Sequence, residues 1–356
     1  IQKIYSFLGL KKIEVEEADA GDIVAIAGLD DIYVGETICK EGLEEALPLI
    51  KVSEPTVQMN FGTNTSPFAG KEGQFVTGRK IEERLFRETQ RDVSLRINRV
   101  DNKEEWIVSG RGELHLSILI ENLRREGFEF QVSRPRVILK EIDGVINEPY
   151  EYVQVDVPDE YIGSAIEMFG NRRGNLEGMN SKDGQTRLIY TIPSKGLIGF
   201  MTDFLTATHG YGIINHTFLE YRPVQPDVFM GRKLGVLVSI NQGMATTYAC
   251  GGVEDRGELL IEPGIMVYEG MIVGICNREE DLAVNITREK QMTNQRSATK
   301  DSTIVLKKPR VFSLENYLSF IDEDELVEVT PNSIRLRKMI LDTVERKKYD
   351  LSLIHI

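Results

Sequence analysis

The sequence predicts an α+β protein of several domains: a partial β-barrel, two split βαββαβ sandwiches and a β-rich C-terminal domain. Three observations predict this class. A chain of 356 residues exceeds what one hydrophobic core usually organises, so two to four domains are expected. Residues 106–135 combine strand, glycine turn, helix and strand in a short span. The same order of elements recurs further along the chain without obvious sequence identity.

Residues 1–52 are interpreted as the C-terminal part of a small β-barrel. Short apolar runs at Ile13–Val15 and Ile23–Ala27 are separated by glycine and aspartate turns, a pattern typical of barrel strands. Alone, such strands would leave unpaired edges. The chain begins at Ile1 within this β-rich stretch, with neither an initiator Met nor a signal-peptide pattern, and we expect it to be part of a longer protein.

Residues 53–135 predict the first sandwich. Apolar alternation at 57–61 indicates a strand, helical spacing marks 81–88, and a second strand is expected at 93–97. The unit 106–135 supplies the second half. The resulting order, β-α-β-β-α-β, is that of a ferredoxin-like sandwich with two helices on one face of a four-stranded sheet.

Within the first sandwich, the second helix has the clearest pattern. Gly110 and Gly112 bracket the turn before it, and Gly127 follows it as a C-terminal cap. The turn reads GRGE and lacks the lysine and the length of a phosphate-binding P-loop, which favours a steric role. The apolar stripe recurs at i, i+3, i+4 and i+7 and consists of Leu116, Leu119, Ile120 and Leu123.

Residues 136–226 predict a second ferredoxin-like sandwich, and residues 227–350 a β-rich domain. The second sandwich is expected to hold strand 153–157, helix 162–169, strand 188–192, helix 197–208 and strand 214–221. The C-terminal domain is expected to hold strands at Gly235–Ile240, Thr246–Cys250, Glu258–Ile261, Met266–Tyr268, Met271–Ile275 and Thr303–Leu306, and a short helix at 314–321. No structure is assigned to the apolar tail 351–356.

Composition excludes several classes of protein. The hydrophobic fraction is 41%, and no apolar run reaches the roughly 18 to 20 residues that span a bilayer. The three cysteines lie far apart, which argues against a disulfide framework or a zinc site and favours a reducing cytoplasm. The four histidines show no metal-binding spacing, and no nucleophile has a local base. We therefore predict no metal, no cofactor and no catalytic residue in this chain.

Charge is sorted along the chain rather than mixed. The net charge of −13 opposes general binding to nucleic acid. The basic segment, residues 281–310, is the exception, with seven lysines and arginines against three acidic residues. Its small polar background suits contacts to an RNA backbone through Arg288, Lys290, Arg296 and Lys300, although a solvated surface loop is an equal alternative.

Two further charged groups have alternative interpretations. Arg172 and Arg173 follow a helix and could either meet phosphate or cap helix carbonyls. The acidic block, which consists of Asp322, Glu323, Asp324, Glu325 and Glu328, could be read as paired catalytic carboxylates. A run of adjacent acids favours a solvated helix end instead.

Four motifs resemble one family over nearly the whole chain. They are SGRGELHLSILIENLRREGFEFQVSRP at 109–135, IPSKGLIGF at 192–200, DRGELLIEPGIMVYEGMIVGI at 255–275 and DELVEVTPNSIRLRK at 324–338. The sequence resembles the BipA/TypA family of ribosome-associated translational GTPases. The first motif is shared with other elongation-factor-like GTPases, whereas the last two are particular to this family.

The resemblance implies the domain order barrel domain II, domain III, domain V and a family-specific C-terminal domain, the sandwiches being similar to domains III and V of elongation factor G. It implies a GTP- and Mg²⁺-dependent GTPase whose nucleotide domain is not in this sequence. It also implies a monomer that binds the ribosome at the elongation-factor site, with 23S rRNA and A-site tRNA as partners. Roles in ribosome assembly, stress adaptation and virulence regulation are implied too.

A function of another class was weighed against this one. Tandem ferredoxin-like modules also occur in regulatory proteins that bind a small metabolite between the modules. That alternative accounts for the paired sandwiches but leaves the basic segment unexplained.

Overall fold

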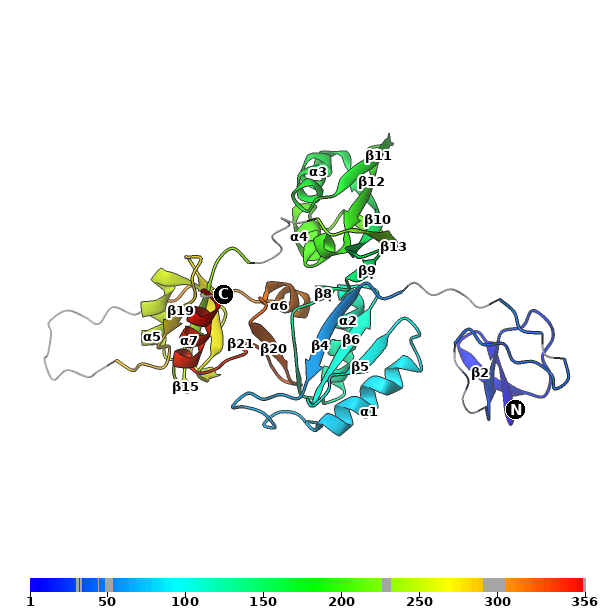
Figure 1. Ribbon diagram of the computed structural model, residues 1–356, viewed down its shortest axis with the longest axis horizontal. Coiled ribbons are helices and arrows are strands. Elements are labelled where there is room, and N and C mark those ends of the chain that lie inside the picture. The colour runs from blue at the N-terminus through cyan, green and yellow to red at the C-terminus, as the bar shows by residue number, and fades with distance from the viewer. Residues whose placement is uncertain are drawn as a thin grey trace, which may run out of the picture.

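The computed structural model describes residues 1–29, 32, 34–43, 45–48, 54–225, 232–290 and 305–354 (Figure 1). At the N-terminal end, β1 (Lys3–Leu8), β2 (Lys11–Val15) and β3 (Val24–Ala27) form an antiparallel sheet in the order β2-β1-β3. Gly9, with φ of 61°, makes the tight turn between β1 and β2. The predicted partial barrel is thus an open three-stranded sheet.

The first sandwich has the predicted order of elements. Its strands run β7-β4-β6-β5 across the sheet, and both helices pack on one face around Trp106 and Phe61. Strand β5 begins later than predicted because Asp92 accepts the Ser94 N–H at 2.8 Å and holds 92–95 in a turn. The elements are β4 (Val57–Gly62), α1 (Gly78–Thr89), β5 (Arg96–Arg99), β6 (Glu105–Gly110), α2 (Glu113–Arg125) and β7 (Phe130–Val132), with β8 (Arg136–Val137) paired to β4.

The second sandwich repeats this plan in the strand order β11-β12-β10-β13. Phe169 stacks on Tyr190 with 4.4 Å between ring centroids, and Phe200 and Phe204 complete the core under the helices. Strand β11 was not assigned from the sequence because its residues are nearly all exposed. The elements are β9 (Lys140–Ile142), β10 (Val145–Pro158), η1 (Asp159–Tyr161), α3 (Ile162–Asn171), β11 (Asn175–Lys182), β12 (Gln185–Pro193), η2 (Ser194–Leu197), α4 (Phe200–Ala207) and β13 (Ile213–Pro223).

The C-terminal domain is β-rich, as predicted. Its elements are β14 (Val236–Ser239), β15 (Gly243–Met244), α5 (Thr247–Val253), η3 (Glu254–Arg256), β16 (Gly257–Leu259), β17 (Met266–Val267), β18 (Met271–Cys276), β19 (Leu282–Val284), α6 (Leu314–Phe320), β20 (Glu325–Val329), β21 (Ile334–Lys338) and α7 (Thr343–Ile354).

Two predictions about this domain were wrong. Thr246–Cys250 is not a strand, because the Thr246 side chain accepts the Ala249 N–H and starts helix α5. Val305 and Leu306 are not in a strand, and the remainder of that prediction lies outside the described residues. Helix α7 continues to Ile354, into the tail that was left without structure.

The C-terminal domain and the first sandwich share one eleven-stranded sheet. Strand β20 pairs antiparallel with β7 of the first sandwich and with β21, and β21 pairs with β18. Helix α6 packs on α2 of the first sandwich (Figure 1). The fold class is therefore the predicted α+β, but the link through β20 and β21 was not foreseen. No helix in the described ranges is long and apolar enough to cross a membrane.

Candidate nucleic-acid interface

The basic segment leaves the C-terminal domain after β19 and returns before α6. The structure describes its two ends, 281–290 and 305–310. Arg288 and Lys290 are exposed at the outgoing end, whereas Arg296 and Lys300 lie outside the described residues. The described residues therefore show how the two ends of the basic segment are held.

The outgoing end is fixed to Thr246, the N-cap residue of α5. Thr246 donates its backbone N–H to the Ile286 carbonyl at 3.1 Å and its hydroxyl to the Arg288 carbonyl at 2.5 Å. Asn285 Oδ1 accepts both the N–H and the hydroxyl of Thr287, each at 3.1 Å. Because Ile286 is fully buried, the backbone is anchored immediately before the exposed side chain of Arg288.

The returning end is fixed at the other end of α5. Glu254 accepts the backbone N–H of Lys307 at 2.7 Å, and the N–H of Arg310 donates to the Leu259 carbonyl at 3.0 Å. Thr246 and Glu254 are separated by helix α5, which at 1.5 Å per residue gives about 12 Å. The two described ends of the segment are thus held on one short helix.

A hollow of about 310 Å³ lies beside the returning end. Lys307 and Lys308 line it together with Glu254 and Glu258, so its charges are mixed. Arg310 also pairs with Glu258, at 3.5 Å. This hollow is therefore not an anion site in its own right.

Arg172 and Arg173 follow α3 in the second sandwich and differ in their surroundings. Arg172 donates to the carbonyls of Ile198, at 3.0 Å, and Gly196, at 3.5 Å, and lies 3.6 Å from the Asp203 carboxylate. The carbonyls it binds belong to the η2 region rather than to its own helix. Arg173 has φ of 64° and an exposed side chain. Its backbone N–H donates to the Gly170 carbonyl at 3.1 Å, whereas its side chain makes no hydrogen bond or ion pair with another described residue.

The structure does not bring these arginines together with the basic segment. Figure 1 shows α3 in the second sandwich, well separated from α5 in the C-terminal domain. Any contact made by Arg173 would therefore be a second, separate one.

The interpretation of the acidic block as a solvated helix end holds for Glu323 and Asp324, which are exposed just after α6, but was wrong for Glu325 and Glu328. Glu325 and Glu328 are fully buried and belong to strand β20. Glu325 pairs with Arg232 and Lys338, each at 2.8 Å, and Glu328 pairs with Arg335 at 3.0 Å. Each carboxylate is paired with a cation inside the protein, which favours a structural role over a catalytic one, because loss of either carboxylate would leave a buried cation uncompensated.

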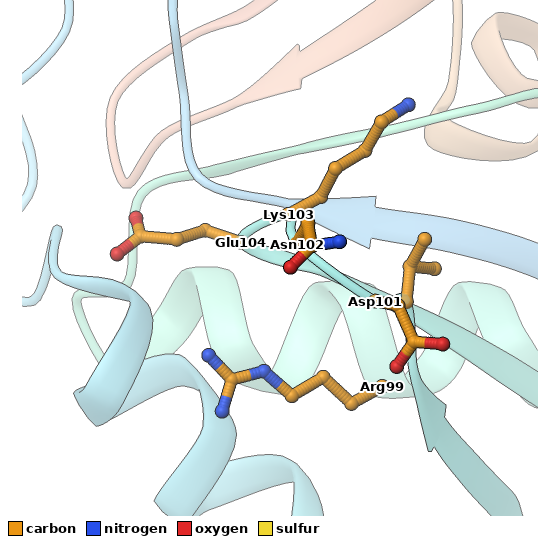
Figure 2. A pocket seen from close by; sticks show the side chains of 6 residues that line it. Arg99, Asp101, Asn102, Lys103 and Glu104 are labelled. Atoms are coloured by element: carbon orange, nitrogen blue, oxygen red, sulfur yellow. The ribbon is translucent and has the colours of Figure 1, made fainter.

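A second hollow, of about 530 Å³, surrounds the turn between β5 and β6 and is open to solvent (Figure 2). Its lining comes from residues 99–104 alone. Figure 2 shows Lys103 and Asp101 pointing away from Glu104 and Arg99, so no set of polar groups converges on a ligand.

Two of the histidines are paired with carboxylates. His115 Nε2 lies 2.7 Å from Asp92, and His216 pairs with Glu151, whose hydrogen bond raises the pKa of the imidazole. Among the residues that the structure describes, no group of three or more His, Cys, Asp or Glu side chains could hold a metal ion.

Three family models match successive parts of the chain. The model of elongation factor G domain III matches 76–134, that of the elongation factor G C-terminus matches 145–231, and that of the TypA/BipA C-terminal domain matches 234–343.

Similar full-length proteins carry the name large ribosomal subunit assembly factor BipA. The one from Bacillus subtilis is 57% identical over 98% of this chain, and those from Synechocystis and Escherichia coli K12 are 51% and 49% identical over the same share. The chain spans 57% to 58% of the length of these relatives. High identity over nearly every residue and the C-terminal family model agree: the chain belongs to the BipA/TypA family.

Proposed function

We propose that this chain is the ribosome- and tRNA-contacting portion of a BipA/TypA translational GTPase, a cytoplasmic monomer that acts in large-subunit assembly, translation and the stress response. The name shared by its relatives supports the ribosomal role. In this proposal GTP and Mg²⁺ belong to a part of the whole protein outside these residues, and the chain itself is not an enzyme.

The basic segment carries the proposal. The chain as a whole has a net charge of −13, yet seven cations are gathered in residues 281–310, and such a local excess attracts phosphates. The segment contains no aromatic residue, which favours contacts to the RNA backbone over stacking on bases. Anchoring of its ends at Thr246 and Glu254 fixes where those cations emerge.

We assign backbone contacts to Arg288, Lys290, Arg296 and Lys300, with 23S rRNA and the A-site tRNA as the partners at the elongation-factor site. Arg173, exposed in the second sandwich, is the better candidate of its pair for a further rRNA contact. Arg172 is already engaged with the carbonyls of the η2 region.

Co-sedimentation with ribosomes tests this function. The native chain is compared with a variant in which Arg288, Lys290, Arg296 and Lys300 are changed to Glu. A control variant carries the same charge change at exposed lysines elsewhere, namely Lys11, Lys12, Lys347 and Lys348. We expect the native chain and the control to pellet and the loop variant to remain in the supernatant.

Other outcomes would point elsewhere. Equal pelleting of all three proteins would show that the basic segment is not the contact. Failure of the native chain to pellet, together with saturable binding of a small metabolite, would favour a ligand-binding protein with tandem ferredoxin-like modules.

A further inference from the structure

The segment 63–73, which connects β4 to α1 of the first sandwich, lies against the C-terminal domain. Asn64 donates its amide both to Glu129 of the first sandwich, at 2.8 Å, and to Glu328 of β20, at 2.9 Å. The Ser66 hydroxyl also donates to Glu328, at 2.9 Å. Carboxylates of two domains thus bind one short segment, which we call the coupling segment.

Phe68, at the middle of the coupling segment, is part of the core of the C-terminal domain. Its ring is 6% exposed and meets Tyr268 edge to face, with 4.9 Å between centroids. The Tyr268 hydroxyl donates to Glu328 at 2.7 Å, and the Arg335 guanidinium lies 5.4 Å above the Phe68 ring. A side chain of one domain therefore fills the core of the other.

The coupling segment is tied back to its own domain on both sides of Phe68. Glu129 accepts the N–H of Gly70 at 2.7 Å and of Gly73 at 2.8 Å. At Gly73 a Cβ atom would lie 2.3 Å from the Glu129 Cβ, so only glycine allows this approach. Glu72 instead lies against the C-terminal domain, where it pairs with Arg335 of β21 and accepts the Thr330 hydroxyl.

The shared sheet runs beneath these contacts. Val327 of β20 is paired with Val132 of β7, and Arg337 donates to Gln131 and, at 2.6 Å, to Thr65. We propose that the coupling segment makes the first sandwich and the C-terminal domain one cooperative unit, with Phe68 as a positioning residue that fixes the C-terminal domain and the basic segment relative to the first sandwich. Only its effect on ribosome binding rests on the proposed function.

Two intrinsic probes allow the two domains to be followed separately. Trp106 is the single tryptophan and is buried in the first sandwich. Cys250 and Cys276 are buried in the C-terminal domain, so a thiol reagent reaches them only when that domain opens. The remaining cysteine, Cys39, is replaced by Ser in every protein tested.

The test perturbs one domain and observes the other. Leu85→Ala makes a cavity in the first sandwich, where Leu85 is fully buried in α1. We expect this substitution to lower two urea midpoints by the same amount: the midpoint for labelling of Cys250 and Cys276 and the midpoint for the change in Trp106 fluorescence. A shift of the fluorescence midpoint alone would show two independent domains and overturn the proposal.

The role of Phe68 is tested in the same assay. In a Phe68→Ala background, we expect Leu85→Ala to shift the urea midpoint of thiol labelling much less than that of Trp106 fluorescence. In a Phe68→Leu background, we expect Leu85→Ala to shift both midpoints by the same amount. Phe204→Ala, in the core of the second sandwich, serves as the control. In that background Leu85→Ala should still shift both midpoints together. If Leu85→Ala shifts both midpoints equally in the Phe68→Ala background, the shared sheet alone couples the domains, and this role of Phe68 is overturned.

Ribosome binding supplies the positioning readout. Phe68→Ala should weaken co-sedimentation several-fold without changing its dependence on salt, because all basic side chains remain, and Phe68→Leu should restore it. Unchanged binding by Phe68→Ala would refute the positioning role. If the native chain itself does not bind, the proposed function fails, whereas the urea experiment still decides whether the domains are coupled.

Discussion

Glu113 of the first sandwich accepts a hydrogen bond from the backbone N–H of Gly199 in the second sandwich, with 2.6 Å between Oε2 and N. Gly199 is the N-cap residue of helix α4 and has φ of 69°, and a Cβ atom there would lie 2.7 Å from the Cβ of Ser319 on α6. The second sandwich, the first sandwich and the C-terminal domain therefore meet at one glycine.

The glycine at this junction is expected to resist substitution. Gly199→Ala would combine left-handed backbone strain of about 1 kcal/mol with a clash against Ser319. Gly210 is a matched control, because its φ is 82° and nothing lies within 4 Å of its Cβ position. Urea unfolding of both variants should show the larger loss of stability for Gly199→Ala. Equal losses would mean that the contact with Ser319 has no energetic weight.

The Glu113 carboxyl makes stability depend on pH. Burial, the largest effect, raises its pKa to about 7, and the negative charge of Glu315 adds to this rise. The hydrogen bond from the Gly199 N–H and the positive charge of Arg172 lower the pKa but do not cancel the rise. Between the ordinary pKa of 4.5 and about 7, only the folded state keeps the proton, so stability falls as pH rises through this window. The loss amounts to at most about 3 kcal/mol.

Glu113→Gln removes this titration. The unfolding free energy of the variant relative to the native chain should therefore rise between pH 5 and pH 8, measured by urea denaturation at each pH. A difference that is constant over this range would contradict the assigned pKa.

The acidic block contains a matched pair of substitutions. Glu325 is 0% exposed, and although burial raises its pKa, the hydrogen bond from Arg232 and the charge of Lys338 outweigh that effect and lower it. Glu325→Gln leaves these two cations short of a counter-charge and should cost about 3 to 5 kcal/mol of unfolding free energy.

Glu323, two residues away, is the control for Glu325. Its side chain is 66% exposed and pairs with Arg136 at the surface. Glu323→Gln should change stability by less than about 0.5 kcal/mol. Similar costs for the two substitutions would remove the distinction between buried and surface pairs in the acidic block.

The anchor of the basic segment can be removed without touching a basic residue. Thr246→Val removes both the α5 cap and the hydrogen bond to the Arg288 carbonyl, at a cost of about 1 kcal/mol, and should weaken ribosome binding. Thr246→Ser should retain both. Ser313→Ala removes a comparable cap from α6, whose hydrogen bonds are to Asn316 rather than to the basic segment, and should lower stability without affecting binding. Equal effects of the two cap losses on binding would argue against an anchoring role for Thr246.

Local periodicity was enough to predict both sandwiches, because stripes such as Leu116 to Leu123 and strands such as Val153 to Val157 alternate against their own core. It failed at β20 and β21. There Glu325, Glu328 and Arg337 are buried. Glu325 pairs with Arg232 and Glu328 with Arg335, while Arg337 donates to Gln131 and Thr65, so charges that suggest exposure in the sequence are held inside the fold.

The candidate interface was only partly predictable. The cations of the basic segment could be recognised from the sequence, but their anchors could not. Thr246 and Glu254 act through hydrogen bonds to carbonyl and amide groups some 40 to 50 positions further along the chain, which no local pattern reveals. A threonine before a small-residue run is a weak signal of a helix start, and apolar alternation at 246–250 obscured it.

The most direct measurement of the central claim is the salt dependence of ribosome binding, with Arg288, Lys290, Arg296 and Lys300 changed to Gln. If the four side chains contact phosphates, the slope of log Kobs against log salt concentration should become shallower by about 3 relative to the native chain. A parallel line with an unchanged slope would show that the basic segment makes no contact with ribosomal RNA or tRNA.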